Sequence, residues 1–284
     1  MRVNSRVLPY LLLLPATVFL ALFFLYPFVL VAWQSFATEE GVLTSKYFTK
    51  MYKHWKFDKA LTNTFLLVLA VVPIQLALAL LMATLVSKMK SGREMILYIW
   101  TIPLGISDLA AGLIWLAIFE QTGFLNSILY SLGLIDQQIP FLGYQNKTMI
   151  FVAVMIAEVW RATAIMLVIL VAGIGLIPKE YYEAAEVFGA SRWKQFTRVT
   201  IPLLKPSLQT ALILRVILAF EVFAVVIALG GTNLPILMGE VYRWQFELRD
   251  SHVAAAYAMV ILAVSIAFTL LFMWLLRTPE EARI

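Results

Sequence analysis

Five ionisable side chains lie inside long apolar stretches of this sequence. An ionised group at the centre of a membrane helix costs about 2.5–3.5 kcal/mol, so each needs a charged partner or a water-filled cavity. Glu158 and Arg161 are three residues apart, which places them on one helical face and allows an ion pair. Carboxylate, guanidinium and amide groups can also hydrogen-bond a neutral, hydroxyl-rich ligand. The five candidates for either role are Asp108, Glu158, Arg161, Arg215 and Glu221.

Both interpretations of these charges stay open at this stage. Glu158 and Arg161 fit a pair that fixes helix packing as well as they fit a ligand contact. Asp108 and Arg215 could join across helices, although no spacing in the chain requires it. Glu221 has apolar neighbours and no local partner, which favours contact with a ligand or its pathway.

Uncharged side chains near these positions extend the candidate surface. Trp160, Phe220 and Phe223 could stack on a ligand ring, and Asn233 could line an outer mouth, although a plain turn explains Asn233 equally well. Gln75 stands alone in an apolar stretch, and we expect it to hydrogen-bond between helices.

The composition places these residues in a membrane protein. The chain has 284 residues, of which 62% are hydrophobic and 14% charged, against about 45–50% and 25% in soluble domains. It contains no Cys and two His, which excludes thiol chemistry and disfavours a metal site. The net charge of +5 indicates basic cytoplasmic loops better than nucleic-acid binding.

Stretches of about 20 apolar residues predict an all-α polytopic membrane protein. The first run is too long for a signal peptide and is expected to remain as a span. We predict one domain over 1–284, with six transmembrane helices near 8–33, 60–87, 95–119, 148–177, 205–229 and 253–276.

Loop charges predict the orientation. The short loop at 88–94 and the polar segment at 178–206 carry many Lys and Arg residues, and basic residues favour the cytoplasmic side. An even number of spans then places both termini in the cytoplasm as well.

The polar segment between the fourth and fifth spans has helix signals of its own. Pro178 can open a helix, and Gly189 is a natural stop because glycine adopts the left-handed conformation. Ser191 suits the cap of a second helix, Arg192 to Thr200. A helix at 179–188 would place Tyr182, Ala185, Glu186 and Gly189 on one face. Ala184 and Ala185 would keep this surface slim enough for a partner to approach closely. A cytoplasmic helix–turn–helix is therefore expected here, although an amphipathic helix resting on lipid would show a similar composition.

The segment contains Glu-Ala-Ala at 183–185, three residues, Gly189, nine residues, and then Val199, any residue, Ile201 and Pro202. This order resembles the coupling loop of ATP-binding-cassette (ABC) import permeases. Phe188 departs from it, since the family usually has Asp before the Gly. The resemblance implies that the helix inserts into a groove on an ATPase, where Glu183 pairs with a base. The residues that it assigns to ATPase coupling are Glu183, Ala184, Ala185, Gly189 and Pro202.

Weaker matches extend the resemblance over nearly the whole chain, with the core of the family fold at about 60–276. Ala60-Leu61-Thr62-Asn63-Thr64 resembles the entry to the second span of sugar permeases. The resemblance thus implies import of a sugar, a di- or oligosaccharide such as an α-glucoside, by alternating access. It also implies a second homologous permease, two ATPase subunits and an extracytoplasmic sugar-binding protein.

Several alternatives remain beside this interpretation. The cargo could be glycerol-phosphate or a polyol, and the chain could instead be a stand-alone ion-coupled transporter or a membrane enzyme. The sequence has no Gly-x-x-x-x-Gly-Lys-Ser/Thr phosphate loop. We therefore expect no cofactor on this chain, with ATP and Mg²⁺ bound by the partner ATPase and no nucleic-acid partner.

Overall fold

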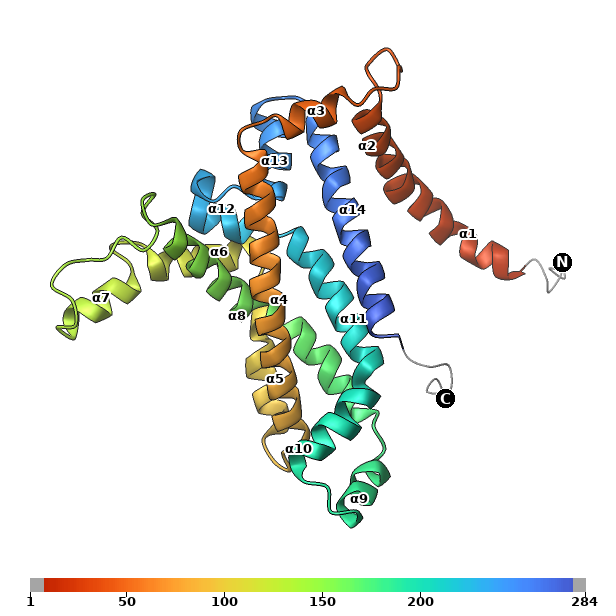
Figure 1. Cartoon of the computed structure of the whole chain (residues 1–284), viewed down its shortest axis with the longest axis vertical. Coiled ribbons are helices and arrows are strands. Elements are labelled where there is room, and N and C mark those ends of the chain that lie inside the picture. The colour runs from red at the N-terminus through yellow and green to blue at the C-terminus, as the bar shows by residue number, and fades with distance from the viewer. Residues whose placement is uncertain (1–7, 278–284) are drawn as a thin grey trace.

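The computed structural model describes residues 8–277, and most of them are helical (Figure 1). Within these residues, six helices are long and apolar enough to cross a membrane. A bent pair of short helical segments, 224–233 and 237–247, would make a seventh span if the two crossed the membrane together. This confirms the predicted fold class. In chain order the α-helices are α1 (Leu8–Leu20), α2 (Tyr26–Phe36), α3 (Lys46–Tyr52), α4 (Phe57–Ser87), α5 (Arg93–Thr101), α6 (Asp108–Phe119), α7 (Phe124–Ser131), α8 (Lys147–Gly175), α9 (Lys179–Val187), α10 (Arg192–Gln195), α11 (Ile201–Phe220), α12 (Ala224–Gly230), α13 (Leu237–Tyr242) and α14 (Ser251–Leu275).

Helices α4, α8, α11 and α14 form the centre of the bundle. Small residues let them approach closely, as is usual where helices pack in lipid: Ala79 and Ala83 of α4 are completely buried. Gly173 of α8 faces α11 so closely that an added Cβ would collide with the side chain of Ser207. The core therefore depends on backbone approach as well as on large apolar side chains.

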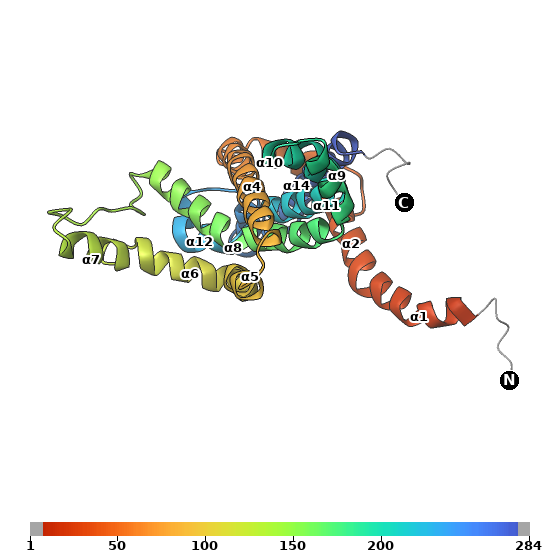
Figure 2. The same ribbon diagram turned by 90° about the horizontal axis from the view of Figure 1, so that it is seen from below.

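The first span is one helix with a π-helical turn, Ala21–Leu25, between α1 and α2. It agrees with the predicted 8–33 and continues to Phe36. α2 packs on α14, whereas α1 extends away from the other helices in both views (Figures 1 and 2). Apolar side chains of α1 such as Leu12 and Phe19 are exposed, so lipid or another protein must cover them.

The predicted basic loops meet at one end of the bundle. The turn between α4 and α5 and the helices α9 and α10 lie together at the lower end in Figure 1. The opposite end holds α3 and the start of α14, joined by an ion pair of 2.7 Å between Lys50 Nζ and Asp250 Oδ2. The two loops with the strongest predicted cytoplasmic bias thus share one side.

The third span was predicted as one helix over 95–119, and this is wrong. α5 ends at Thr101, a 3₁₀ turn covers Ile102–Gly105, and α6 starts at Asp108. Pro103 in that turn lacks an N–H and disrupts a regular helix. The Ser107 hydroxyl then accepts a hydrogen bond from the amide of Ala110 and caps the new helix.

The fifth span also differs from the predicted 205–229. α11 ends at Phe220, residues 221–223 are not helical, and α12 follows in a new direction. α12 and the following 3₁₀ turn make an 81° bend with the segment that starts at α13. Glu221 therefore lies exposed at the end of a helix, not inside a span as predicted.

Candidate transport and coupling sites

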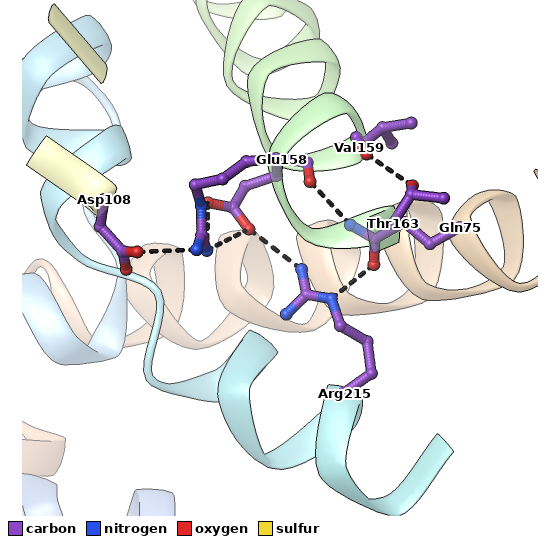
Figure 3. Close-up of polar contacts among 7 residues, drawn as sticks. Gln75, Asp108, Glu158, Val159, Thr163 and Arg215 are labelled. Atoms are coloured by element: carbon purple, nitrogen blue, oxygen red, sulfur yellow. Dashed lines mark hydrogen bonds and ion pairs between the residues drawn. The ribbon is translucent and has the colours of Figure 1, made fainter. Parts of the chain in front are cut away.

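Four of the five predicted charges form one chain of ion pairs near the middle of α8 (Figure 3). Arg161 Nη1 lies 2.7 Å from Asp108 Oδ1, and Arg161 Nη2 lies 3.2 Å from Glu158 Oε1. The other Glu158 oxygen accepts a hydrogen bond of 3.0 Å from Arg215 Nη2. The chain alternates in sign and sums to zero, which limits the cost of holding four charges within a membrane bundle.

Gln75 completes this charge network by joining three helices. Its amide nitrogen donates to the backbone oxygen of Glu158 at 2.7 Å, and its amide oxygen accepts from Arg215 Nε. Gln75 is fully buried, and Glu158 and Arg215 are each only 1% exposed. The prediction that Gln75 hydrogen-bonds between helices is confirmed, since α4, α8 and α11 meet at its side chain.

The pairing within the charge network is partly as predicted. The Glu158–Arg161 pair is confirmed. A direct Asp108–Arg215 pair is wrong, because Asp108 opens α6 and reaches Arg161, while Arg215 reaches Glu158. The network has a buried end, formed by Glu158 and Arg215, and an accessible end, where the Asp108 side chain is 51% exposed. Only the accessible end can meet a ligand without dismantling the bundle.

The predicted aromatic residues separate into core and surface groups. Phe220 is buried between Phe65 and Phe268, with ring centroids 5.5 and 5.3 Å away, so it cannot stack on a ligand. Trp160 is half-buried and meets Trp115 edge to face at 5.9 Å. Trp160 and Arg161 of α8 both contact α6, through Trp115 and Asp108 respectively, and Trp160 stays a candidate for stacking.

The remaining candidates lie away from the charge network. Phe223 is half-buried and packs 5.1 Å from the ring of Tyr242. Asn233 is exposed and lines a cavity of about 440 Å³ with Asn63 and Pro235. Among residues 8–277, no hydrogen bond or ion pair joins Glu221, Phe223 or Asn233 to the charge network.

Two polar residues at the start of α4 hold the bent segment, a role that the sequence did not reveal. Asn63 donates a hydrogen bond of 2.8 Å to the backbone oxygen of Pro235. The Thr64 hydroxyl accepts one of 2.9 Å from the amide of Leu237, the first residue of α13. The available signal was a pair of adjacent polar residues opening an apolar helix.

The coupling segment, residues 178–202, has the predicted helix–turn–helix form. Gly189 has φ of +71°, and the amides of Gly189 and Ala190 donate to the carbonyls of Glu186 and Ala185 at 2.9 Å each. These two bonds form a Schellman motif, which satisfies the last carbonyls of a helix. The Ser191 hydroxyl accepts from the Lys194 amide at 3.4 Å. The stop at Gly189 and the cap at Ser191 are confirmed.

The second half of the coupling segment is tied to its first half. After α10, a π-helical turn at Phe196–Thr200 leads into α11, whose first turn contains Pro202. The hydroxyls of Tyr182 and Thr200 lie 3.1 Å apart, and Thr200 is 5% exposed. α9 is therefore hydrogen-bonded directly to the start of a membrane helix.

The predicted face of α9 is only partly exposed, since Glu186 and Gly189 are exposed but Tyr182 and Ala185 are not. Tyr182 and Ala185 are half-buried because their face turns back toward the π-helical turn. Glu183 and Ala184 are exposed, and at the tip Val187 and Phe188 are 85% and 89% exposed. A partner would meet this carboxylate and apolar tip.

A looser polar cluster lies at the opposite end of the bundle. His54 Nδ1 is 3.8 Å from Glu240 Oε2, and Arg243 Nη1 is 3.5 Å from the same oxygen. Burial lowers the pKa of His54, and the nearby charges of Arg243 and Lys56 lower it further. His54 therefore stays neutral at pH 7 beside a buried carboxylate.

A bundle of long apolar helices with a rigid helix–turn–helix at one end is the architecture of a membrane transport subunit. The family model for the inner membrane component of binding-protein-dependent transport systems matches residues 41–278. The chain belongs to this family. This confirms the resemblance inferred from the coupling segment.

Named relatives agree with the family. The sulfoquinovosyl glycerol permease protein SmoG of Agrobacterium fabrum is 30% identical over 98% of this chain and 92% of its own length. The trehalose permease protein SugA of Mycobacterium tuberculosis is 31% identical over 82% of this chain and 76% of its own length. The trehalose/maltose permease protein MalF of Thermococcus litoralis is 29% identical over 94% of this chain and 92% of its own length.

A solved structure agrees with the fold. A bacterial ABC transporter that imports the acidic polysaccharide alginate matches with a TM-score of 0.81, at 23% identity and over 95% of each chain. The chain is thus a multi-pass permease subunit of an ABC importer in the inner membrane, working with a binding protein. It is a transport subunit, and the family membership decides against the ion-coupled transporter and the membrane enzyme.

Proposed function

We propose that this permease carries a di- or oligosaccharide into the cytoplasm by alternating access. The relatives named for trehalose, maltose and sulfoquinovosyl glycerol transport favour a sugar. The observation that carries the proposal is the accessible end of the charge network. There Asp108 and Arg161 offer hydrogen-bond groups near the middle of α8, and the half-buried Trp160 contacts the same helix, α6, that carries Asp108.

In this proposal the two ends of the charge network have different roles. Arg161 is held between two carboxylates, so its direction is fixed before a ligand arrives. A sugar hydroxyl can hydrogen-bond Asp108 or Arg161 while Glu158, Gln75 and Arg215 keep the helices in place. Glu221, Phe223 and Asn233 would then contact the sugar further along the pathway.

The coupling segment would transmit force from the ATPase. We propose that it faces the cytoplasm, with both termini on the same side, because the basic loops gather at its end of the bundle. Glu183 and the apolar tip at Val187 and Phe188 would dock on an ATPase. The Tyr182–Thr200 hydrogen bond joins α9 to the start of α11, which contains Arg215, so motion of α9 reaches the charge network through one helix.

The assembly proposed here contains a second homologous permease, two ATPase subunits and an extracytoplasmic sugar-binding protein. ATP and Mg²⁺ would bind to the ATPases, and this chain would carry no cofactor. The exposed apolar surface of α1 would meet the second permease or membrane lipid.

The test is a sugar screen with the assembled complex in proteoliposomes, read as ATP hydrolysis and as uptake of labelled sugar. We expect di- or oligosaccharides with the binding protein to stimulate both. Asp108→Asn should lower uptake while its thermal unfolding temperature stays near that of the unmodified chain. Stimulation by glycerol-phosphate or a polyol and by no sugar would refute the proposed cargo.

A further inference from the structure

A cavity of about 660 Å³ lies between the coupling segment and the ends of the membrane helices. One wall is the turn from α4 into α5, and the other is formed by α9, α10 and the π-helical turn. Four cations line the cavity with one carboxylate, Glu186. The cations are Lys88, Arg93, Lys179 and Arg192.

The charges of this basic cavity are not neutralised by the chain itself. In the part of the protein that the structure describes, none of the four cations lies within 4.0 Å of a carboxylate oxygen in an ion pair. Lys88 and Arg93 come from one wall, Lys179 and Arg192 from the other. Like charges on facing walls repel, so an anion between them would stabilise the closed arrangement of the two walls.

Thr84, one of the lining residues, carries a hydroxyl that can donate a hydrogen bond. Its side-chain oxygen is buried with no hydrogen-bond partner in the described chain. A buried polar group without a partner costs free energy, and a bound acceptor would remove that cost. Cations around a hydroxyl donor are the groups that bind phosphate oxygens.

The surroundings place this cavity at the membrane boundary. α4 ends at Ser87 and α8 ends at Gly175, and both of these residues line the cavity. The cavity therefore lies where two apolar spans end. Large apolar side chains within three residues of these cations in the sequence are exposed, namely Leu176, Trp193 and Met95 at 82%, 71% and 69%. Exposed Trp beside basic residues is typical of the headgroup level of a bilayer.

We propose that the basic cavity binds a phosphate group, supplied by the headgroup of an anionic phospholipid. Basic pockets between membrane helices on the cytoplasmic side are suited to such headgroups. The bound phosphate would bridge the α4–α5 turn and the coupling segment, and so fix the angle of α9 to the spans. This inference rests on the proposed cytoplasmic orientation of the coupling segment but not on the identity of the sugar.

The test measures lipid retention by the purified full chain without its ATPase. The chain is exchanged into detergent with equal amounts of phosphatidylglycerol and phosphatidylcholine, and bound lipid is counted by native mass spectrometry. We expect phosphatidylglycerol to be retained preferentially. Lys88→Gln with Arg93→Gln should reduce this preference by about fivefold for each cation removed.

The matched control removes the same charge from the same end of the molecule. Lys90 and Lys194 are exposed and do not line the cavity, so Lys90→Gln with Lys194→Gln should keep the lipid preference. An equal loss in both double variants would show general attraction to basic loops and overturn the proposal. Equal retention of the two lipids by the unmodified chain would overturn it too.

Two further arms separate the sources of an anion. Inorganic phosphate that raises the unfolding temperature of the unmodified chain but not of Lys88→Gln/Arg93→Gln would support a phosphate site and name soluble phosphate as its ligand. If that variant retained lipid normally but lost affinity for the purified ATPase, an acidic protein group would be the ligand, and the proposal would fail. Neither arm involves sugar, so the cargo assignment is tested separately.

Discussion

The charge network and the coupling segment both consist of charged helical residues, but they use charge in opposite ways. In the network, Glu158 and Arg215 are 1% exposed and every carboxylate faces a guanidinium. In the coupling segment, Glu183 is exposed and the tip residues Val187 and Phe188 touch little of the chain. Paired buried charge fixes one helix arrangement, whereas exposed groups on a capped helix are available to a partner.

The comparison separates stability from coupling. Changes at the buried end of the charge network, at Glu158 or Arg215, should first alter whether the bundle folds. Changes in the coupling segment should leave folding intact and alter the transfer of motion between subunits.

Glu158→Leu should cause the greatest damage to folding. It leaves Arg215 buried with Gln75 as its only side-chain partner, and an uncompensated buried charge costs about 3–5 kcal/mol. We expect a sharp fall in the yield of folded protein and in its thermal unfolding temperature in detergent. Adding Arg215→Met should recover much of the loss, because no charge is then stranded. A double variant that is as damaged as the sum of the two single changes would show that the pair is not coupled.

Gly189→Val should abolish coupling without unfolding the bundle. A side chain at φ +71° is strained by about 1–2 kcal/mol, and the strain would displace α9 because the residue has open space around it. Membrane insertion and unfolding temperature should be nearly unchanged, while sugar-stimulated ATP hydrolysis and uptake are lost. Normal uptake would contradict the role of this turn.

Gly41 provides the matched control for that experiment. It has φ of +79° and open space, but lies in the loop between α2 and α3 at the far end of the bundle. Gly41→Val carries similar backbone strain and should transport normally. A loss of transport in both variants would trace the effect to strain in general.

Elements set by neighbouring residues could be predicted from the sequence. The coupling segment is specified locally: Pro178 begins it, Gly189 and Ser191 turn it, and all three act within a few residues. The spans follow from composition over about 20 residues, and four of the six lie within three residues of the predicted limits at both ends.

The breaks and pairings could not be predicted in the same way. Residues 221–223 contain no Pro or Gly, and the chain turns there because α12 packs on α6, where a Cβ on Gly112 would lie 2.7 Å from Ala228. Arg215 and Glu158 are 57 residues apart, and only the crossing of α8 and α11 brings them together. Pro103 does mark the break in the third span, but the continuous hydrophobicity of residues 95–119 favoured the prediction of a single helix.

The helix crossing itself can be tested with two glycines of α8. Gly173→Ala would force its Cβ against Ser207 of α11, and overpacking of this kind costs about 1–3 kcal/mol. Gly175→Ala is the control, because no atom lies within 4 Å of its added Cβ. We expect a lower unfolding temperature for the first variant and an unchanged or slightly higher one for the second. Equal behaviour would mean that α8 and α11 approach less closely than the charge network requires.

The loose cluster around His54 should give a smaller effect that depends on pH. Its pKa in the folded chain is lowered from 6.5 by burial and by the charges of Arg243 and Lys56. The unfolded chain therefore binds more protons than the folded chain. The contribution of His54 to the free energy of unfolding is fully present above about pH 6.5 and is lost as the pH falls through the lowered pKa. We expect the unfolding temperature to decrease between pH 8 and pH 5.5, and to decrease less in His54→Gln. Identical pH profiles for the two proteins would show that His54 does not control this end of the bundle, whereas a difference would show that the loosely paired His54 makes it sensitive to pH.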